Sequence, residues 1–493
     1  MGNNQRFTRV SRRDFFKTTA LAGMAVTLPL PSFAGQGSIA AIKPSPAGNK
    51  RNLLFMSNVP ERHEKFISSI KSIKEYQVNV TPVKTDFKNP LDLLKPIREK
   101  NADIVVMHLS GIYMSSRKIA EEMGTLDIPV ILLPVDYSLI MWETDLAASF
   151  RIKGTNALVA NSEDHAIDLI KIMAAPRALE GKKALMFGRP FDSTSIPAPN
   201  LNKNYVYRQT GVSLEYRPID ELKERIKEVD DAAAKKEMER WKKGAVKIVE
   251  PPDTAILESA RLSVLLRSIV DSEGLSGISI DCLSFTFGSD RSIPVPCLAI
   301  TRLRDEGVAA PCETDVCMML SCMVMQEVSR RPSFVCNVSG VDVNKSTTVL
   351  RHCVAPTKIY GPDSPGVPYI LRDYHGMGGV TSEIEYPIGL DITMGGFSKD
   401  LKSFMIWPGR VQPGVYDTDT PSFKDAPPEM QKMRKFCTNR AEVKINEVNR
   451  FLQSITGIHH IMVAGSFRKE IYDAMLRMNI DVIAPPDLSV PEV

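Results

Sequence analysis

Short apolar runs alternate with helix-like segments over the first third of the sequence. Strands that are apolar on both faces and are separated by helices are typical of a parallel sheet with helices packed on each side. We therefore expect a first α/β domain over 51–178. The predicted strands are 52–56, 103–109, 129–135 and 157–160, and the predicted helices include 61–76, 90–100 and 115–123.

The same alternation begins again near residue 180 and predicts a second α/β domain over 179–340. The helix predicted over 219–243 is dense in Glu, Lys and Arg, and its mixed signs at i,i+4 spacing favour a solvated face over a binding surface. The predicted strands are 183–188, 213–217 and 277–281, and the predicted helices are 219–243 and 254–272.

From about residue 341 to the end, glycine-rich turns separate short apolar runs, which is typical of an antiparallel sheet or barrel. The predicted fold class is therefore α/β, with two doubly wound parallel-sheet domains followed by a β-rich, barrel-like C-terminal domain. The runs are 347–350, 380–385, 403–407 and 461–463, and the predicted helices are 443–456 and 468–478.

Residues 1–34 resemble a twin-arginine export signal. Arg12 and Arg13 precede an apolar run over 18–30, and Ala34 ends a small-residue cleavage pattern. The segment 35–50 is rich in Gly, Ser, Pro and Ala and is predicted to be a linker. We expect cleavage after Ala34, a periplasmic or otherwise exported protein, the twin-arginine translocase as a partner during export, and no stable membrane span afterwards.

The charge of the chain argues against nucleic-acid binding. The net charge of +4 resides in the predicted signal, which holds five basic residues and one acid, so the rest of the chain is neutral. Affinity for phosphates needs a clustered cationic surface. The hydrophobic fraction of 43% and the charged fraction of 24% are ordinary for a globular protein.

The eight cysteines do not form a disulfide framework. None occurs before Cys282, and no two are spaced as C-x-x-C. A structural zinc site is therefore not expected, and buried free thiols are the prediction.

Carboxylate, amide and imidazole side chains follow one another at predicted element ends in the last third of the chain. Glu313 and Asp315 open an apolar, Met-rich helix over 316–328, where capping is the simple explanation. Asn337 ends a predicted strand, His352 lies at a strand exit, and His459 precedes the strand 461–463. Oxygen and nitrogen groups of this kind are the ligands of a divalent metal site.

Several segments resemble the L-fucose isomerase and L-arabinose isomerase-like superfamily. They are 298–307, Cys312-Glu313-Thr314-Asp315-Val316, Arg331-Pro332, Val349-Leu350-Arg351-His352-Cys353, and 457–460 with Gly465. The resemblance implies a manganese-dependent aldose–ketose isomerase, an intramolecular oxidoreductase of carbohydrate metabolism that acts through an enediol. Its substrate would be a small sugar, and its cofactor Mn²⁺ or another divalent cation.

The resemblance also implies roles for individual residues. Glu313 matches a metal-ligating glutamate that shuttles a proton, and His459 matches a late histidine ligand, with His460 as the adjacent alternative. His352 matches a histidine near the metal or the substrate. Asn337 stands where the superfamily has a second acid, so the implied metal set is Glu313, Asn337 and His459, with Glu313 and Asn337 at the catalytic positions. Thr314 and Val354 stand where the superfamily has glycine.

Asn337 leaves the function open, because an amide oxygen ligates a cation but does not exchange a proton near neutral pH. One hypothesis is an active isomerase, or an enzyme of altered chemistry, with Asp315 or Asp342 in place of the lost acid. A second is a carbohydrate-binding protein that has lost turnover, and a third is a periplasmic ligand-binding module.

The resemblance further implies a homo-oligomer, a trimer or hexamer, in which a neighbour completes each cleft. His63 and His108 then either reach a neighbour's cleft or make local hydrogen bonds. The glycine-rich loop from Tyr374 to Gly379 is either a lid or an ordinary turn.

Overall fold

The structure is a computed structural model of the chain. It describes residues 50–74, 76–85, 91–108, 116–124, 126–192, 198–286, 292–373, 379–414, 439–487 and 491. The predicted signal, the predicted linker up to residue 49, the loop 374–378 and Cys437 lie outside these residues.

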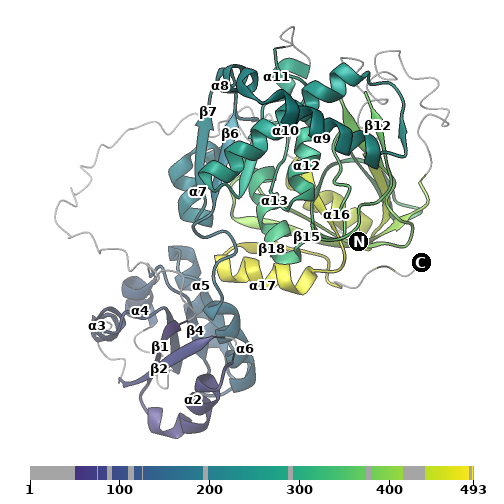
Figure 1. Cartoon of the computed structure of the whole chain (residues 1–493). Coiled ribbons are helices and arrows are strands. Elements are labelled where there is room, and N and C mark those ends of the chain that lie inside the picture. Colours follow the sequence, from purple (N-terminus) through teal and green to yellow (C-terminus); the bar gives the residue numbers. More distant parts are fainter. Residues whose placement is uncertain are drawn as a thin grey trace, which may run out of the picture. The chain divides into compact units, whose positions relative to one another are not determined.

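A parallel five-stranded sheet with the order β2-β1-β3-β4-β5 forms the first α/β region (Figure 1). Its strands are β1 (Lys50–Ser57), β2 (Gln77–Lys84), β3 (Ile104–His108), β4 (Val130–Leu133) and β5 (Ala157–Val159). The helices of this region are α2 (Glu64–Lys71), α3 (Leu91–Glu99), α4 (Ser116–Met123), α5 (Met141–Lys153) and α6 (Glu163–Ala174).

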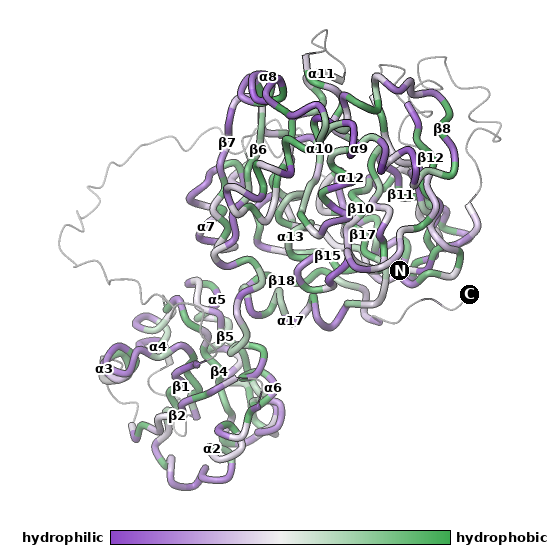
Figure 2. Tube along the Cα trace, viewed as in Figure 1, coloured by the Kyte–Doolittle hydropathy of each residue, from purple (hydrophilic) through white to green (hydrophobic). Residues whose placement is uncertain are grey.

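Helices cover both faces of this sheet, as predicted. Leu54 and Met56 of β1 belong to one hydrophobic cluster with residues of α3, α4 and α5. Leu53 and Phe55 point to the other face and belong to a cluster with α2 and α6. Hydrophobic positions, in green in Figure 2, follow the strands at the centre of the sheet. Strand β2 was not predicted, because it is an edge strand with few apolar residues and contains Pro82.

The second region is built on a parallel sheet with the order β7-β6-β9. The strands β6 (Lys183–Phe187), β7 (Ser213–Arg217) and β9 (Gly277–Ile280) match the three predicted runs. The helices are α7 (Lys203–Thr210), α8 (Asp220–Arg225), α9 (Asp231–Gly244), α10 (Asp253–Glu273), α11 (Leu283–Thr286) and α12 (Cys297–Asp305), and η3 (Pro199–Leu201) and η4 (Ile226–Glu228) are 3-10 turns.

The prediction of one continuous helix over 219–243 is wrong, because the chain forms two helices there, α8 and α9. Val229 has an extended backbone, and the carboxylate of Asp230 accepts a hydrogen bond from the backbone N–H of Ala233. That bond satisfies a free donor at the start of α9, so a new helix begins there.

The apolar helix α13 (Val316–Ser329) is buried along nearly its whole length. Its residues share one hydrophobic cluster with Ala184 and Met186 of β6 and with Val335 and Ile461 of the C-terminal sheet. A helix that is covered on opposite sides in this way needs apolar residues all round, which explains the Met-rich run in the sequence.

The C-terminal sheet has the order β14-β17-β10-β11-β16-β15-β18, and β14 also pairs with β15, which closes six of the strands into a ring. All of its pairings are antiparallel except β15 with β18. The strands are β10 (Phe334–Asp342), β11 (Thr347–His352), β14 (Asp391–Phe397), β15 (Ser403–Gln412), β16 (Asn439–Lys444), β17 (His459–Ala464) and β18 (Asp481–Ile483). The predicted β-rich C-terminal region is therefore present.

A small sheet with the order β13-β12-β8 accompanies it, formed by β8 (Lys247–Ile248), β12 (Tyr369–Arg372) and β13 (Thr381–Ile384). The predicted helix 443–456 begins too early, because Val443 is a fully buried strand residue that pairs with Thr348 and Val411. The helices here are α16 (Val448–Ser454) and α17 (Arg468–Met478). Within the described part of the chain, no helix is long and apolar enough to cross a membrane.

Candidate metal centre

Glu313 is positioned by a stretch of chain that runs beside β9. Parallel bridges pair Gly277 with Ala309 and Ile280 with Cys312. The backbone N–H of Glu313 then donates to the carbonyl of Ile280 at 3.0 Å. Glu313 therefore lies at the carboxyl end of a parallel sheet, the edge at which α/β proteins usually bind their ligands.

The backbone at Glu313 and Thr314 is left-handed, with φ of 67° and 50°. Side chains disfavour this conformation by roughly 1–3 kcal/mol per residue, so neighbouring contacts must hold it. The backbone N–H of Thr314 donates to Oγ of Ser279 at 3.1 Å, and its hydroxyl donates to the carbonyl of Arg189 at 2.5 Å. These bonds hold Thr314 in a backbone conformation that glycine adopts most readily.

The Glu313 carboxylate lies between two buried imidazoles. One oxygen is 3.1 Å from Nε2 of His459, and the other is 3.5 Å from Nε2 of His352. One ligand atom from each of the three residues lies within 4.8 Å of the other two. Glu313 and His459, 146 positions apart in the chain, thus meet in one buried group that could hold a metal ion.

Asp315 fixes the other side of His459. Its Oδ1 accepts a hydrogen bond from the backbone N–H of Met318 at 3.1 Å and so caps α13. Its Oδ2 lies 2.9 Å from Nδ1 of His459, and both side chains are almost inaccessible to solvent. Metal-ligating histidines usually donate their second N–H to a carboxylate, which fixes the tautomer and the ring orientation. Capping was thus the correct expectation for Asp315, whereas the Glu313 carboxylate contacts the two histidines.

Strand alternation places His459 and His460 on opposite faces of β17. Ile461 faces α13, so His459 shares that face, whereas His460 shares a face with Met462 in the other hydrophobic cluster of the sheet. Both ring nitrogens of His460 lack a hydrogen-bond partner among the described residues. Burial, and then the nearby His459, lower the pKa of His460 to about 4. His459 is therefore the histidine that faces Glu313.

Asn337 lies directly opposite His459 in the register of β10 and β17. Residues paired across antiparallel strands point to the same face, with Cβ atoms roughly 5 Å apart. Its Oδ1 is buried and has no hydrogen-bond partner within the described residues. A buried acceptor without a partner is costly, so this oxygen is suited to a cation.

The charges of the group depend on one another. Burial works to raise the pKa of Glu313, but its contacts with His352 and His459 outweigh burial and lower the pKa well below the usual range. For His459, burial favours a lower pKa, but Asp315 and Glu313 outweigh it and raise the pKa to about 9. The pKa of His352 is also raised: burial opposes the rise, and Cys312 and Glu313 produce it.

A cavity of about 360 Å³ opens onto Glu313. This volume falls within the range of small-molecule sites, which is roughly 300–1,000 Å³. The Phe191 ring lies 5.3 Å from that of His459, centroid to centroid. The cavity is lined by Arg189, Pro190, Phe191, Asp192, Asp281, Leu283 and Glu313.

Sequence reasoning missed Arg189, Phe191 and Asp281 because they follow β6 and β9, outside the carboxylate, amide and imidazole motifs of the last third of the chain. A larger cavity of about 590 Å³, lined among others by Lys182 and Arg331, contains none of the candidate ligands.

Three other predicted residues lie elsewhere. Asp342, a suggested replacement acid, accepts hydrogen bonds from the backbone of Asn344 and Lys345 in the turn between β10 and β11, so its carboxylate serves that turn. His108 contacts Ser57, with Nδ1 3.2 Å from its Oγ, and His63 is 3.4 Å from Glu163. Both histidines therefore make local contacts, which is one of the two alternatives predicted for them.

No protein-family model matches the sequence, and no curated protein shows significant similarity to it. The fold and the site define a mixed α/β protein with a β-rich C-terminal sheet and buried Cys, Glu and His groups that could hold a metal ion.

Proposed function

We propose that this protein is a metal-dependent aldose–ketose isomerase-like enzyme that acts through an enediol on a small carbohydrate. The observation that carries the proposal is the Glu313 carboxylate, 3.1 Å from His459 Nε2 and 3.5 Å from His352 Nε2, at the mouth of a cavity. An ionised carboxylate beside a bound ligand is the group that removes a proton from carbon in such a reaction.

The donor set fits a divalent ion such as Mn²⁺. Glu313, Asn337 and His459 would hold the ion through a carboxylate oxygen, an amide oxygen and an imidazole nitrogen, with His352 beside them. Oxygen and imidazole donors suit manganese. The unpartnered Oδ1 of Asn337 and the Asp315 carboxylate behind His459 support this assignment.

When bound, the ion would polarise the sugar carbonyl and acidify the neighbouring C–H and O–H groups. Glu313 would take the proton from the carbon that bears the neighbouring hydroxyl and return it to the former carbonyl carbon, while the proton of that hydroxyl would pass, directly or through a water molecule, to the former carbonyl oxygen. Asp315 would keep the imidazole of His459 oriented throughout. Arg189 and Asp281 line the same cavity and would orient the sugar hydroxyls.

The second candidate is a carbohydrate-binding protein without turnover, and Asn337 favours it. Among the described residues, Glu313 and Asp315 are the carboxylates that contact the histidine pair, and Asp315 is occupied by His459 and by the cap of α13. If the isomerisation needs two carboxylates that exchange protons, this site lacks one of them, and the protein would bind a sugar without converting it.

The experiment is a metal analysis of the purified full-length protein, followed by a panel of aldoses assayed with Mn²⁺. The isomerase is supported if an aldose is converted and Glu313→Gln loses about 10³-fold in turnover. Sugar binding with no conversion of any aldose supports the binding protein. A native protein that takes up neither manganese nor sugar contradicts both.

Export and assembly belong to the same proposal. We infer a twin-arginine signal cleaved after Ala34, a periplasmic location, and a trimer or hexamer. Sequencing the amino terminus of protein from the periplasmic fraction tests the first two, and light scattering tests the third. A cytoplasmic, uncleaved monomer would contradict all of them.

A further inference from the structure

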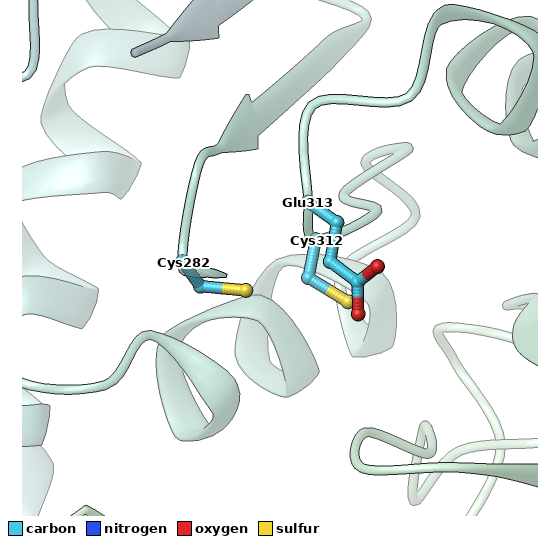
Figure 3. A group of neighbouring side chains, drawn as sticks. All are labelled: Cys282, Cys312 and Glu313. Atoms are coloured by element: carbon cyan, nitrogen blue, oxygen red, sulfur yellow. The ribbon is translucent and has the colours of Figure 1, made fainter. Parts of the chain in front are cut away.

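Two cysteines that are 30 positions apart meet beside Glu313. Cys282 follows β9 by two residues, and Cys312 is paired with Ile280 at the end of that strand. Figure 3 shows the sulfur of Cys282 pointing toward Cys312, with the Glu313 carboxylate next to the Cys312 sulfur. One ligand atom from each of the three residues lies within 4.8 Å of the other two.

The backbone builds this convergence. The N–H of Cys282 donates to the carbonyl of Ile280 at 2.8 Å, so the chain turns sharply directly after β9. The carbonyl of Ile280 also accepts from the N–H of Glu313 at 3.0 Å. Both arms of the group are thus anchored to the same peptide, and both cysteines are free and buried.

We propose that Cys282, Cys312 and Glu313 form a second metal site, which takes a thiophilic divalent ion such as Zn²⁺ or Cd²⁺. Two thiolates and one carboxylate are a ligand set that such ions prefer over manganese. Tetrahedral zinc with Zn–S bonds of about 2.3 Å holds two sulfurs roughly 3.8 Å apart, which lies inside the observed limit. Binding would displace the two thiol protons to solvent.

The surroundings favour a metal over a plain dithiol. The group includes a carboxylate, which has no place in a disulfide. Behind Cys312, Nδ1 of His352 lies 3.7 Å from the sulfur, and Nε2 of the same ring faces Glu313. His352 therefore stands between the two groups and would act as an outer partner of the sulfur.

The shared carboxylate makes the two sites interfere. Glu313 is a member of both groups, so an ion held by the cysteines competes for the oxygens that manganese needs. A thiophilic ion should then inhibit the protein by weakening manganese binding. The thiolate site itself does not depend on the proposed sugar chemistry, whereas the competition rests on manganese binding at Glu313.

The first test is a Cd²⁺ titration of the full-length protein kept under reducing conditions, followed through the ultraviolet charge-transfer band of cadmium thiolates. We expect one cadmium ion per chain with two sulfur neighbours by X-ray absorption. Cys282→Ser and Cys312→Ser should each weaken binding by roughly 100-fold or more. Cys336→Ser, a matched change at a buried cysteine in the C-terminal sheet, should leave the band unchanged.

A native protein without the band, or with the band retained in both cysteine variants, would overturn the site. So would loss of the two thiols to a disulfide under these reducing conditions. Circular dichroism establishes whether each variant is folded, and the X-ray absorption of the native protein decides the sulfur count without any variant.

The second test separates the two sites. His459→Gln should lose manganese, measured by electron paramagnetic resonance, and keep the cadmium band. In the native protein, cadmium should raise the apparent Kd for manganese at least tenfold. Manganese binding that ignores cadmium would overturn the competition. A cadmium band in a protein that takes no manganese would support the cysteine site and contradict the proposed function.

Discussion

Two pairs of neighbouring imidazoles, His63 with His108 and His352 with His459, differ in the carboxylates beside them. In the first sheet, His108 ends β3 with its ring 4.3 Å from that of His63, and Glu163, the carboxylate 3.4 Å from His63, is 46% exposed. In the candidate metal centre, Asp315 is buried and Glu313 is partly buried, and both contact His459 directly.

The difference appears in the pKa values. Burial, followed by the neighbouring His63, lowers the pKa of His108 to about 4, so that imidazole is neutral at pH 7. At His459 burial acts in the same direction, but two carboxylates reverse it and raise the pKa to about 9. Carboxylates in direct contact with the ring, and not the imidazoles themselves, prepare a site for a cation.

The largest expected effect comes from removing the carboxylate that defines the comparison. Glu313→Gln should weaken manganese binding by roughly 100-fold or more, because it replaces a charged ligand oxygen with the weaker, neutral oxygen of an amide. Glu163→Gln, the matched change beside His63, should leave manganese affinity unchanged. Isothermal titration calorimetry on both variants measures this. Equal losses of manganese affinity in the two variants would contradict the distinction between the two imidazole pairs.

Asn337→Asp should increase the difference between the two imidazole pairs, because it adds a carboxylate to the candidate metal centre. If the protein is an isomerase that lacks half of its acid–base pair, turnover of a substrate aldose should rise by about 10²-fold, because the new acid can exchange a proton. The change preserves the side-chain size. Turnover that stays the same or falls would show that Glu313 alone carries the proton transfer.

Asp315→Asn tests the carboxylate behind His459. Asparagine still caps a helix well, so α13 should remain intact. The negative charge of Asp315 beside Nδ1 of His459 is lost. Manganese affinity should fall by about 10–100-fold. Thermal unfolding monitors the helix separately. A fall in stability with unchanged metal affinity would show that Asp315 acts only as the cap of α13.

Manganese affinity should increase with pH below about 9. In the metal-free protein His459 is protonated below this value, and the ion must displace that proton. Loss of one proton corresponds to about a tenfold change in affinity per pH unit. Titrations in several buffers, with proton release measured directly, test this. Affinity that is independent of pH would show that His459 is already neutral.

The smallest effect concerns stability alone. The pKa of His108 is about 4 in the folded protein and near its ordinary value of 6.5 in the unfolded chain. The unfolded state therefore binds the proton first, and the free energy of unfolding should fall as pH decreases from about 6.5 to 4. After allowance for solvent screening, about 2 kcal/mol is expected. His108→Gln should remove this part of the pH dependence in urea unfolding. An unchanged profile would contradict it.

Elements with strong local patterns were predicted well. The helix α17 has the predicted bounds, and α13 ends one residue beyond its prediction. Errors occurred where tertiary pairing outweighs local pattern: β2 is stabilised by pairing with β1, and Val443 belongs to a strand because two neighbours pair with it.

The candidate site divides in the same way. The sequence alone indicated Glu313, Asn337, His352 and His459 as a set, because residue type and order along the chain are local information. It left His459 and His460 undecided, and its prediction of buried free thiols, which Cys282 and Cys312 confirm, did not show that these two cysteines lie beside each other. Only the register of β10 with β17 and the bridge from Ile280 to Cys312 decided these points. Which side chains meet depends on hydrogen bonds between distant strands, and no short stretch of sequence encodes them.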